Sequence, residues 1–223
     1  DKNQNFGNIM IAKEGWKIVI ILFFMTVFFR IIGELNGFEW MHIFTIIIGI
    51  LFLFCLIFFR DPKRVIPQGE NNFVSPADGK IVNIEKVNDP EIGNGVLISI
   101  FLSIFNVHVN RIPGSVLIKN KEYKKGKFLA AFNHKASDEN EQIIILMESL
   151  FGLIKVKQIA GLIARRIHRY AEVGKKLQKG DRLGFIMFGS RTDIIFPVDY
   201  EVFVQKGQKV TGGETIIAKI DTN

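Results

Sequence analysis

Two long apolar runs near the N-terminus restrict the folds open to this chain more than any other feature. Residues 17–32 carry only Lys17 and Arg30 as charges, and residues 40–59 carry none. About 20 helical residues cross the roughly 30 Å hydrocarbon core of a bilayer, and Arg30 can reach the headgroups and so lengthen the first run. We therefore predict that residues 1–60 form a membrane anchor, a transmembrane or membrane-inserted helical hairpin. A buried or interfacial helical hairpin is the alternative.

The charges around the runs predict how the anchor is oriented. The connecting loop carries Glu34 and Glu39 but no Lys or Arg, whereas residues 2–17 and 60–64 are rich in Lys and Arg. Positive flanks favour the cytoplasmic side of a membrane. We therefore expect both ends, and with them the soluble domain, on the cytoplasmic face of the cell membrane. A cleaved signal peptide is disfavoured, because no small-residue cleavage site follows the first run.

The net charge of +7 requires a partner or a solvated surface. We expect two basic clusters to face anionic lipid headgroups, while a solvated basic face is the alternative for single lysines. Nucleic acid is not expected, because neither a stacking motif nor a recognition helix accompanies the lysines. Cys55 is the one cysteine, so disulfides and cysteine-ligated metals are not expected either. The clusters are Lys119, Lys121, Lys124, Lys125 and Lys127, and Lys155, Lys157, Arg165, Arg166 and Arg169.

Residues 61–223 are expected to form a mainly β soluble domain. Short apolar segments are separated there by Gly, Pro and Asn, which is typical of strands and turns. Residues 159–170 also show apolar residues at helical spacing, but their neighbours favour a strand. The clearest segments lie at residues 79–87, 95–102, 116–118, 142–147 and 153–160.

A weak internal repeat occupies the C-terminal third. Each copy places glycines at turns with an apolar residue between them. The copies resemble the half-motifs of biotinyl and lipoyl domains, which have the barrel-sandwich hybrid fold. The segment between the copies contains Ser190 where those domains carry a modified lysine, so a swinging-arm carrier is disfavoured. The copies are Gly174, Leu177, Gly180 and Leu183, and then Gly207, Val210, Gly213 and Ile216.

Residues 184–197 combine two apolar runs with a Gly-Ser-Arg-Thr-Asp turn, a pattern that predicts two strands joined by a tight connection. Gly189 tolerates backbone angles that other residues do not, so the Gly189–Ser190 peptide can be strained and exposed. A serine hydroxyl beside such a bond can attack the preceding carbonyl. An ordinary hairpin tip is the alternative.

Three further segments are more polar than a β-scaffold requires. They are residues 75–80, 106–113 and 136–141. Taken singly, Asp78 is better explained as a turn former than as a catalytic residue, and His108 as a satisfied core or surface histidine.

Five motifs, taken together and in order, resemble those of phosphatidylserine decarboxylases. The resemblance covers the chain from about residue 61 to the C-terminus, and it is closest to the short, archaeal-type form, in which an apolar N-terminal anchor is usual. The motifs are Ser-Pro-Ala-Asp-Gly-Lys at 75–80, Asn-Val-His-Val-Asn-Arg at 106–111 with Pro113, residues 136–141, Ile-Ala-Arg-Arg-Ile at 163–167, and Phe-Gly-Ser-Arg at 188–191.

The resemblance implies an enzyme made as a self-processing proenzyme. In that family the hydroxyl at the position of Ser190 attacks the carbonyl of Gly189, and the ester that forms then eliminates. The chain would be divided between residues 189 and 190 into β and α chains, which remain partners. The new N-terminus would become a covalent, self-generated pyruvoyl cofactor. Its ketone would form a Schiff base with phosphatidylserine in the membrane, and loss of CO₂ would give phosphatidylethanolamine.

The same resemblance assigns roles to individual residues. Ser190 would be the nucleophile and then the prosthetic group, His108 would transfer protons, and Asp78 would orient His108. Longer family members carry a second histidine where this chain has Arg111. Arginine stays protonated, so either His108 serves both cleavage and decarboxylation, or another group does one of them. Arg111, with Asn110 beside it, is assigned to substrate binding.

Two other functions remain open on the sequence. A membrane-tethered, non-catalytic adaptor or carrier with a biotinyl-like β-domain would keep an intact chain. A serine hydrolase built on Ser190, His108 and Asp78 would also leave the 189–190 bond whole, and the sequence has no Gly-x-Ser-x-Gly elbow. A homo-oligomer is left open as well. The remaining histidines, His42, His134 and His168, lie outside the matched catalytic positions and receive no role.

Overall fold

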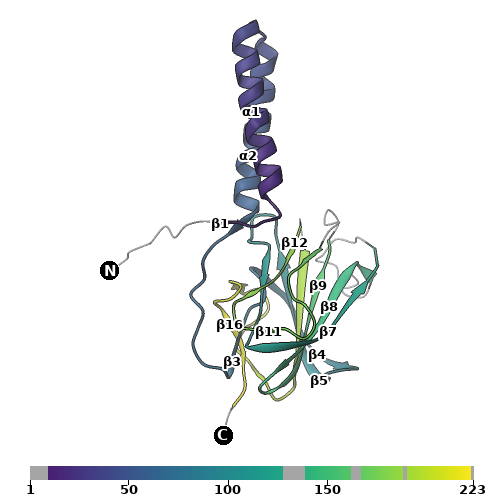
Figure 1. The fold of residues 1–223 in the computed structure, drawn as a ribbon. Helices are drawn as coiled ribbons and strands as arrows, with labels where there is room; N and C mark the ends of the chain where they lie inside the picture. Colours follow the sequence, from purple (N-terminus) through teal and green to yellow (C-terminus); the bar gives the residue numbers. More distant parts are fainter. Residues whose placement is uncertain (1–9, 128–138, 162–166, 188–189, 222–223) are drawn as a thin grey trace, which may run out of the picture. The chain divides into compact units, whose positions relative to one another are not determined.

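A computed structural model describes residues 10–127, 139–161, 167–187 and 190–221. The chain divides into two compact units, Asp1–Lys63 and Arg64–Asn223. The described part of the first unit is mostly helical and that of the second is mainly β, as the sequence predicts (Figure 1).

The first unit consists of two antiparallel helices and a short pair of strands. Helix α1 (Trp16–Asn36) ends at Gly37, whose φ of 64° is left-handed and whose N–H donates to the carbonyl of Gly33. This C-cap lets the chain reverse, and α2 (Glu39–Phe58) runs back beside α1 (Figure 1). Strand β1 (Met10–Ile11) pairs with β2 (Arg60–Asp61), which joins the two ends of the hairpin.

The surface of the helical hairpin is largely apolar. Phe24 in α1 is 63% exposed and Ile46 in α2 is 62% exposed. The helices, of 21 and 20 residues, are long and apolar enough to cross a membrane, and each contains an 18-residue stretch with a mean hydropathy of 2.4 in α1 and 2.8 in α2. Contiguous apolar surface of this extent is unfavourable in water, so the hairpin indicates association with a membrane.

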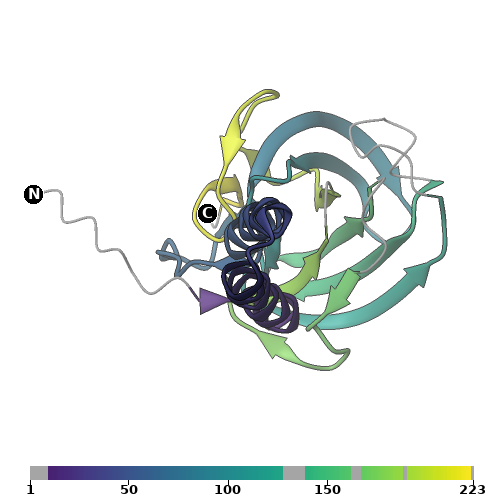
Figure 2. The same cartoon turned by 90° about the horizontal axis from the view of Figure 1, so that it is seen from above.

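An eight-stranded antiparallel sheet forms the main layer of the second unit. It curls around the domain interior, as Figure 2 shows from above. Its central strand, β13, pairs on one side with β9 and on the other with β5. In spatial order the strands are β11 (Lys176–Leu177), β7 (Val116–Lys124), β8 (Gln142–Ser149), β9 (Gly152–Ile159), β13 (Ser190–Pro197), β5 (Gly93–Leu102), β4 (Gly79–Asp89) and β15 (Lys209–Val210).

Two three-stranded sheets complete the second unit. One contains β10 (Ile167–Arg169), β12 (Arg182–Ile186) and β6 (Val109–Arg111), in that order. The other contains β14 (Glu201–Val202), β16 (Ile216–Lys219) and β3 (Asn72–Val74). Strands β9 and β10 lie at the two ends of the ambiguous segment 159–170. The five segments predicted as strands are found as β4, β5, β7, β8 and β9.

The hydrophobic core joins these sheets. One cluster contains Ile98 and Ile194 of the main sheet together with Leu183 of β12 and Ile217 of β16. Alternation along a strand explains why the apolar residues of β13 at positions 194 and 196 point to the same side. At one end of the cluster Phe196 packs against Phe73 and Tyr200, with ring centroids 5.6 and 5.1 Å away.

The two copies of the predicted repeat form corresponding turns. Gly180, with φ of 88°, lies just before β12, and Gly213, with φ of 80°, lies just before β16. Glycine adopts these left-handed angles without the penalty of a side chain. The turns support the repeat, while its likeness to the barrel-sandwich hybrid fold remains a prediction.

The strands on either side of residues 187–189 belong to different sheets. Strand β12 pairs with β10 and β6, whereas β13 pairs with β9 and β5. The two strands predicted within residues 184–197 are therefore present. The ordinary hairpin weighed as the alternative is wrong, because β12 and β13 do not pair with each other in the described chain.

Candidate active site

Ser190 is the first residue of β13 and is fully buried. Its Oγ has no hydrogen-bond partner within the described residues. A buried polar atom left unpaired is costly, and in native proteins such atoms are rare enough to require an explanation. Gly189, the other half of the predicted cleavage site, lies outside the described residues.

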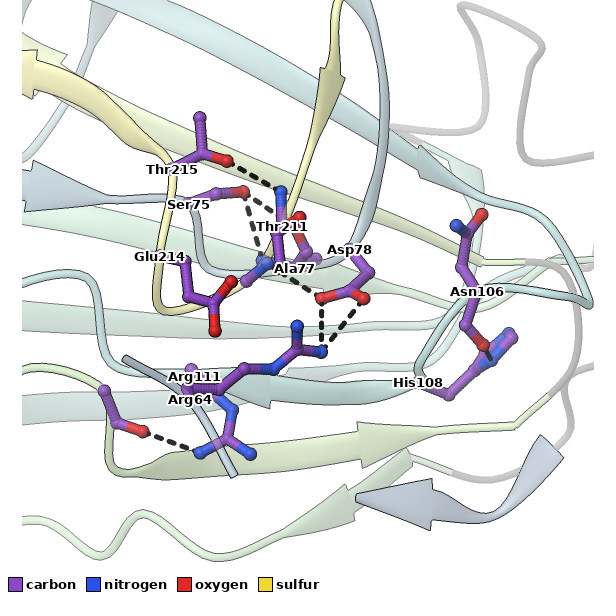
Figure 3. Close-up of polar contacts among 12 residues, drawn as sticks. Arg64, Ser75, Ala77, Asp78, Asn106, His108, Arg111, Thr211, Glu214 and Thr215 are labelled. Carbon is purple, nitrogen blue, oxygen red and sulfur yellow. Dashed lines mark hydrogen bonds and ion pairs between the residues drawn. The ribbon is translucent and has the colours of Figure 1, made fainter. Parts of the chain in front are cut away.

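His108 is held by the loop between β5 and β6. Asn106 fixes that loop, since its Oδ1 accepts from Ser103 N–H at 2.9 Å and from Ser103 Oγ at 2.8 Å. The buried ring of His108 places Nδ1 2.9 Å from the Asn106 carbonyl oxygen (Figure 3). A carbonyl oxygen can only accept, so Nδ1 carries the proton, and Nε2 is the basic nitrogen of the neutral ring.

The segments that lead to Ser190 and to His108 meet at one end of the fold. Ser190 pairs with Leu102, the last residue of β5, from which the chain enters the His108 loop. Ile186, at the end of β12 and four positions before Ser190, donates its N–H to the His108 carbonyl at 3.2 Å. The structure thus brings the predicted nucleophile and the predicted base into one region.

Asp78 lies in a turn just before β4. The turn is fixed by Ser75, whose Oγ donates to the carbonyl of Ala77 at 2.7 Å. The Asp78 carboxylate accepts from Arg64 Nη2, 2.9 Å from both oxygens, and from Gly212 N–H at 2.8 Å. The His108 ring, held by Asn106, is set apart from this carboxylate in Figure 3. The expectation that Asp78 orients His108 therefore remains a prediction.

Arg111 ends β6 beside the Asp78 turn. Its N–H donates to the carbonyl of Pro76 at 2.8 Å, and its Nη1 donates to the carbonyl of Gly180 at 3.0 Å. The residue is only 9% exposed. Arg111 thus joins the Asp78 turn to the first repeat turn, and its predicted role in substrate binding is not decided by these contacts.

A buried amide pair lies beside the strand that Ser190 begins. Asn110 Oδ1 accepts from Gln158 Nε2 at 2.7 Å and from Thr192 Oγ1 at 3.3 Å. Asn110 Nδ2 and Gln158 Oε1 have no partner in the described part of the chain, although both residues are fully buried. Ser190 and Thr192, two positions apart, point to the same side of β13. We call this side of β13 the Ser190 face.

The opposite side of β13, which we call the Arg191 face, carries a satisfied polar cluster. Arg191 Nε donates to Asp193 Oδ1 at 2.6 Å, and Arg191 Nη2 donates to Ser99 Oγ at 2.6 Å. Arg191 is 2% exposed, and the other two are fully buried. Charge-assisted hydrogen bonds of this kind fix the strand from behind.

Several of these contacts were not predicted from the sequence. Arg64 and Gln158 each contact a partner that only the fold brings close. Arg191 and Asp193 are two positions apart in the sequence, and only their partner Ser99 is distant, so a glutamine and an ion pair inside apolar strands were visible signals. Three predicted motifs are partly outside the described residues, at 136–138, 163–166 and 188–189, as is His134. In the remainder of the first motif, Asn140 is buried and donates to the carbonyl of Ala160 at 2.7 Å.

One member of the predicted basic clusters does not face the surface. Lys155 is 4% exposed and is paired with Asp89 and with Glu91, the latter at 2.5 Å. Its expected contact with lipid headgroups is therefore wrong, because its charge is neutralised inside the domain. Lys119, by contrast, lies at the surface with Glu148 at 3.1 Å.

Comparison with known proteins places the chain among decarboxylases. Residues 51–218 match the family model described as phosphatidylserine decarboxylase. The chain is 45% identical over 223 residues to a phosphatidylserine decarboxylase proenzyme of Wolbachia pipientis wMel, covering 97% of this chain and 94% of that protein. It is 41% identical over 221 residues to one of Cupriavidus pinatubonensis, covering 98% and 99%. The similarity thus extends over nearly the whole of both chains.

Proposed function

This chain belongs to the phosphatidylserine decarboxylase family, and we propose that Ser190 both starts the cleavage of its proenzyme and supplies the pyruvoyl group of the mature enzyme. The protein is an enzyme, made as a proenzyme, that decarboxylates phosphatidylserine to phosphatidylethanolamine. The observation that carries the proposal is the match over residues 51–218, within which Ser190 Oγ is buried and unpaired in the described chain.

The cleavage uses only atoms of the chain and one water. Ser190 Oγ attacks the carbonyl carbon of Gly189, and the peptide bond becomes an ester with a free amine on residue 190. Loss of the Cα proton of residue 190 expels the Gly189 carboxylate and leaves a dehydroalanine. Water then converts this end of the chain into a pyruvoyl group and releases ammonia. The products are residues 1–189 and residues 190–223.

The surroundings of Ser190 suit a serine that is converted into a pyruvoyl group and does not keep its hydroxyl. Its hydroxyl is buried at a strand end without a partner among the described residues, so its loss removes no hydrogen bond seen in that part of the chain. When formed, the pyruvoyl group supplies an electron sink for the charge left as CO₂ departs. The pairing of β13 with β5 and β9 would hold it in place.

His108 is the proposed proton carrier. Because Nδ1 donates to the Asn106 carbonyl, Nε2 is the nitrogen able to take the Ser190 Oγ proton during cleavage and to return a proton to carbon during turnover. Asp78, fixed by Arg64 and Gly212, is proposed to help orient His108.

Two further groups are proposed to recognise the serine headgroup. Asn110 Nδ2 is a buried donor without a partner in the described chain, which suits a carboxylate oxygen. The planar guanidinium of Arg111 suits a carboxylate or a phosphate. Both residues lie on β6, next to the strand that ends before Ser190.

The proposed location follows from the helical hairpin and the charges around it. The hairpin would place the enzyme in the membrane that contains its phospholipid substrate, with the β-domain on the cytoplasmic face. Basic residues at the surface would meet anionic headgroups there. The α and β chains would stay together after cleavage.

Cleavage in the Ser190→Ala variant tests the proposal. The wild type should give two chains on a denaturing gel, and the smaller one should be lighter by one ammonia than the sequence 190–223. Ser190→Ala should remain uncut and inactive, while Ser115→Ala, outside the site, should be cut normally. Borohydride reduction with phosphatidylserine should attach the substrate to the small chain. Fragments from Ser190→Ala, or an active wild-type enzyme with a continuous chain, would refute the proposal.

A further inference from the structure

The segment that follows the membrane anchor begins with a buried charged contact. We define residues 64–71 as the linker segment. The side chain of Arg64 is 8% exposed and that of Asp78 is 13% exposed, with Arg64 Nη2 2.9 Å from both carboxylate oxygens. A hydrogen bond between charged groups is stronger than one between neutral groups, and more so when both are shielded from water. An arginine in a passive tether would have no reason to be buried.

The rest of the linker segment is also fixed to the β-domain. Val65 N–H donates to Glu214 Oε1 at 3.0 Å, and Lys179 Nζ donates to the carbonyl of Gly69 at 2.5 Å. The side chain of Ile66 lies so close to Gly180 that a Cβ there would come within 2.3 Å of it. The linker segment thus contacts the β-domain at several positions between residues 64 and 69.

The linker segment packs against the turns at Gly180 and Gly213, which belong to the two copies of the repeat. These turns also bind Arg111 and Asp78. The carbonyl of Gly180 in the first turn accepts from Arg111, and the N–H of Gly212 in the second donates to Asp78. Ile66 reaches both turns, since a Cβ on Gly213 would lie 3.3 Å from its Cδ1. Figure 3 shows Arg64, Asp78 and Arg111 together with Glu214 of the second turn.

We propose that the linker segment is a part of the processing site, in which Arg64 is a positioning residue that fixes the Asp78 carboxylate for self-cleavage. The inference rests on the proposed function, because it gives Asp78 a role in that cleavage. Arg64 keeps the carboxylate charged and in one orientation, and Ile66 keeps the backbone of the linker segment against the turns. Maturation then depends on a seated linker segment as well as on Ser190.

The experiment follows the cleavage of the full-length proenzyme in detergent micelles. Arg64→Ala should release the fragment 190–223 roughly 10- to 100-fold more slowly, because a hydrogen bond to a charged group is lost. Arg64→Lys should keep part of the rate. Lys63→Ala, a change of the same charge at the exposed neighbouring position, should be cut like the wild type. Ile66→Ala should slow cleavage without any change of charge.

Chemical rescue separates positioning from folding. Guanidinium, at concentrations well below those that unfold proteins, should restore cleavage of Arg64→Ala but not of Ser190→Ala or Ile66→Ala. Wild-type cleavage rates in Arg64→Ala would overturn the inference. So would a slow rate that guanidinium does not raise and that parallels a fall in melting temperature, since Arg64 would then act only on folding. A wild-type chain that is never cut would instead refute the proposed function.

Discussion

The two faces of strand β13 differ in whether their buried polar groups have hydrogen-bond partners. On the Arg191 face, Arg191, Asp193 and Ser99 satisfy one another in a fully buried cluster. On the Ser190 face, the Oγ of Ser190 and one amide atom each of Asn110 and Gln158 have no partner in the described chain. Satisfied polar groups stabilise a fold, whereas unsatisfied ones cost stability. The difference supports our proposal that the Ser190 face carries the chemistry, while the Arg191 face holds the strand.

The largest expected effect concerns His108, the proton carrier proposed for Ser190. His108→Ala should slow self-cleavage and decarboxylation by roughly 100- to 10,000-fold, since a positioned proton carrier contributes that much. Gel analysis of cleavage and release of CO₂ from phosphatidylserine would measure the two steps. Lys206→Met, at an exposed site, is the control. Normal turnover in His108→Ala would remove His108 from the mechanism and weaken the contrast between the faces.

Breaking the Arg191 face should affect stability first. Arg191→Met leaves Asp193 buried beside an apolar side chain, and removing one partner of a buried ion pair costs about 3–5 kcal/mol. Denaturant unfolding of the β-domain measures this free energy, with Lys206→Met again as the control. If the variant is as stable as the wild type but is not cut, then the Arg191 face also takes part in the chemistry, and the contrast fails.

The amide pair on the Ser190 face should show the reverse pattern. Replacing Asn110 and Gln158 with leucine and Thr192 with valine removes the three hydrogen-bonding partners together, which can be nearly neutral, so stability should change by less than about 1 kcal/mol. The KM for phosphatidylserine should rise, because the proposed headgroup donor is lost. Unfolding curves and steady-state kinetics would measure the two effects. A loss of stability as large as in Arg191→Met would assign the pair to the scaffold instead.

The smallest expected effect concerns a second ion pair behind the sheet. Lys155 is opposite Ile195, so it lies on the Arg191 face. Burial raises the pKa of Asp89, but the hydrogen bond from Lys155, the bonds from the backbone N–H groups of Glu91 and Ile92, and the charge of Lys155 together hold it below the ordinary 3.8.

Because the pKa of Asp89 is lower in the folded protein than in the unfolded chain, its stabilising contribution is present above pH 3.8 and is lost as the pH falls through the folded value. Asp89→Asn should therefore be less stable than the wild type near neutral pH, and the difference should shrink at lower pH. Melting temperatures across this range measure it. A difference that stays constant with pH would show that the charge of Asp89 does not contribute.

The sequence predicted the elements better than the contacts between them. Apolar runs and glycine turns are local signals, and they located α1, α2 and the strands of the main sheet. Motif order predicted roles for Ser190 and His108, and the fold brings the segments that lead to them together. Arg64 was missed because its contact with Asp78, 14 positions away, exists only once the linker segment packs on the β-domain. Lys155 was assigned to the surface because nothing local shows that Asp89, at the far end of β4, would neutralise it.

The position of β13 within the sheet has a consequence for the nicked protein. Residues 190–223 supply β13 and β15 to the main sheet, and β14 and β16 to one of the smaller sheets. Residues 190–223 therefore belong to two sheets, and β13 is held by backbone hydrogen bonds to β5 on one side and to β9 on the other. If the chain is cut where we propose, covalent continuity ahead of β13 would therefore not be needed to hold the domain together, and residues 190–223 would stay bound as a separate chain.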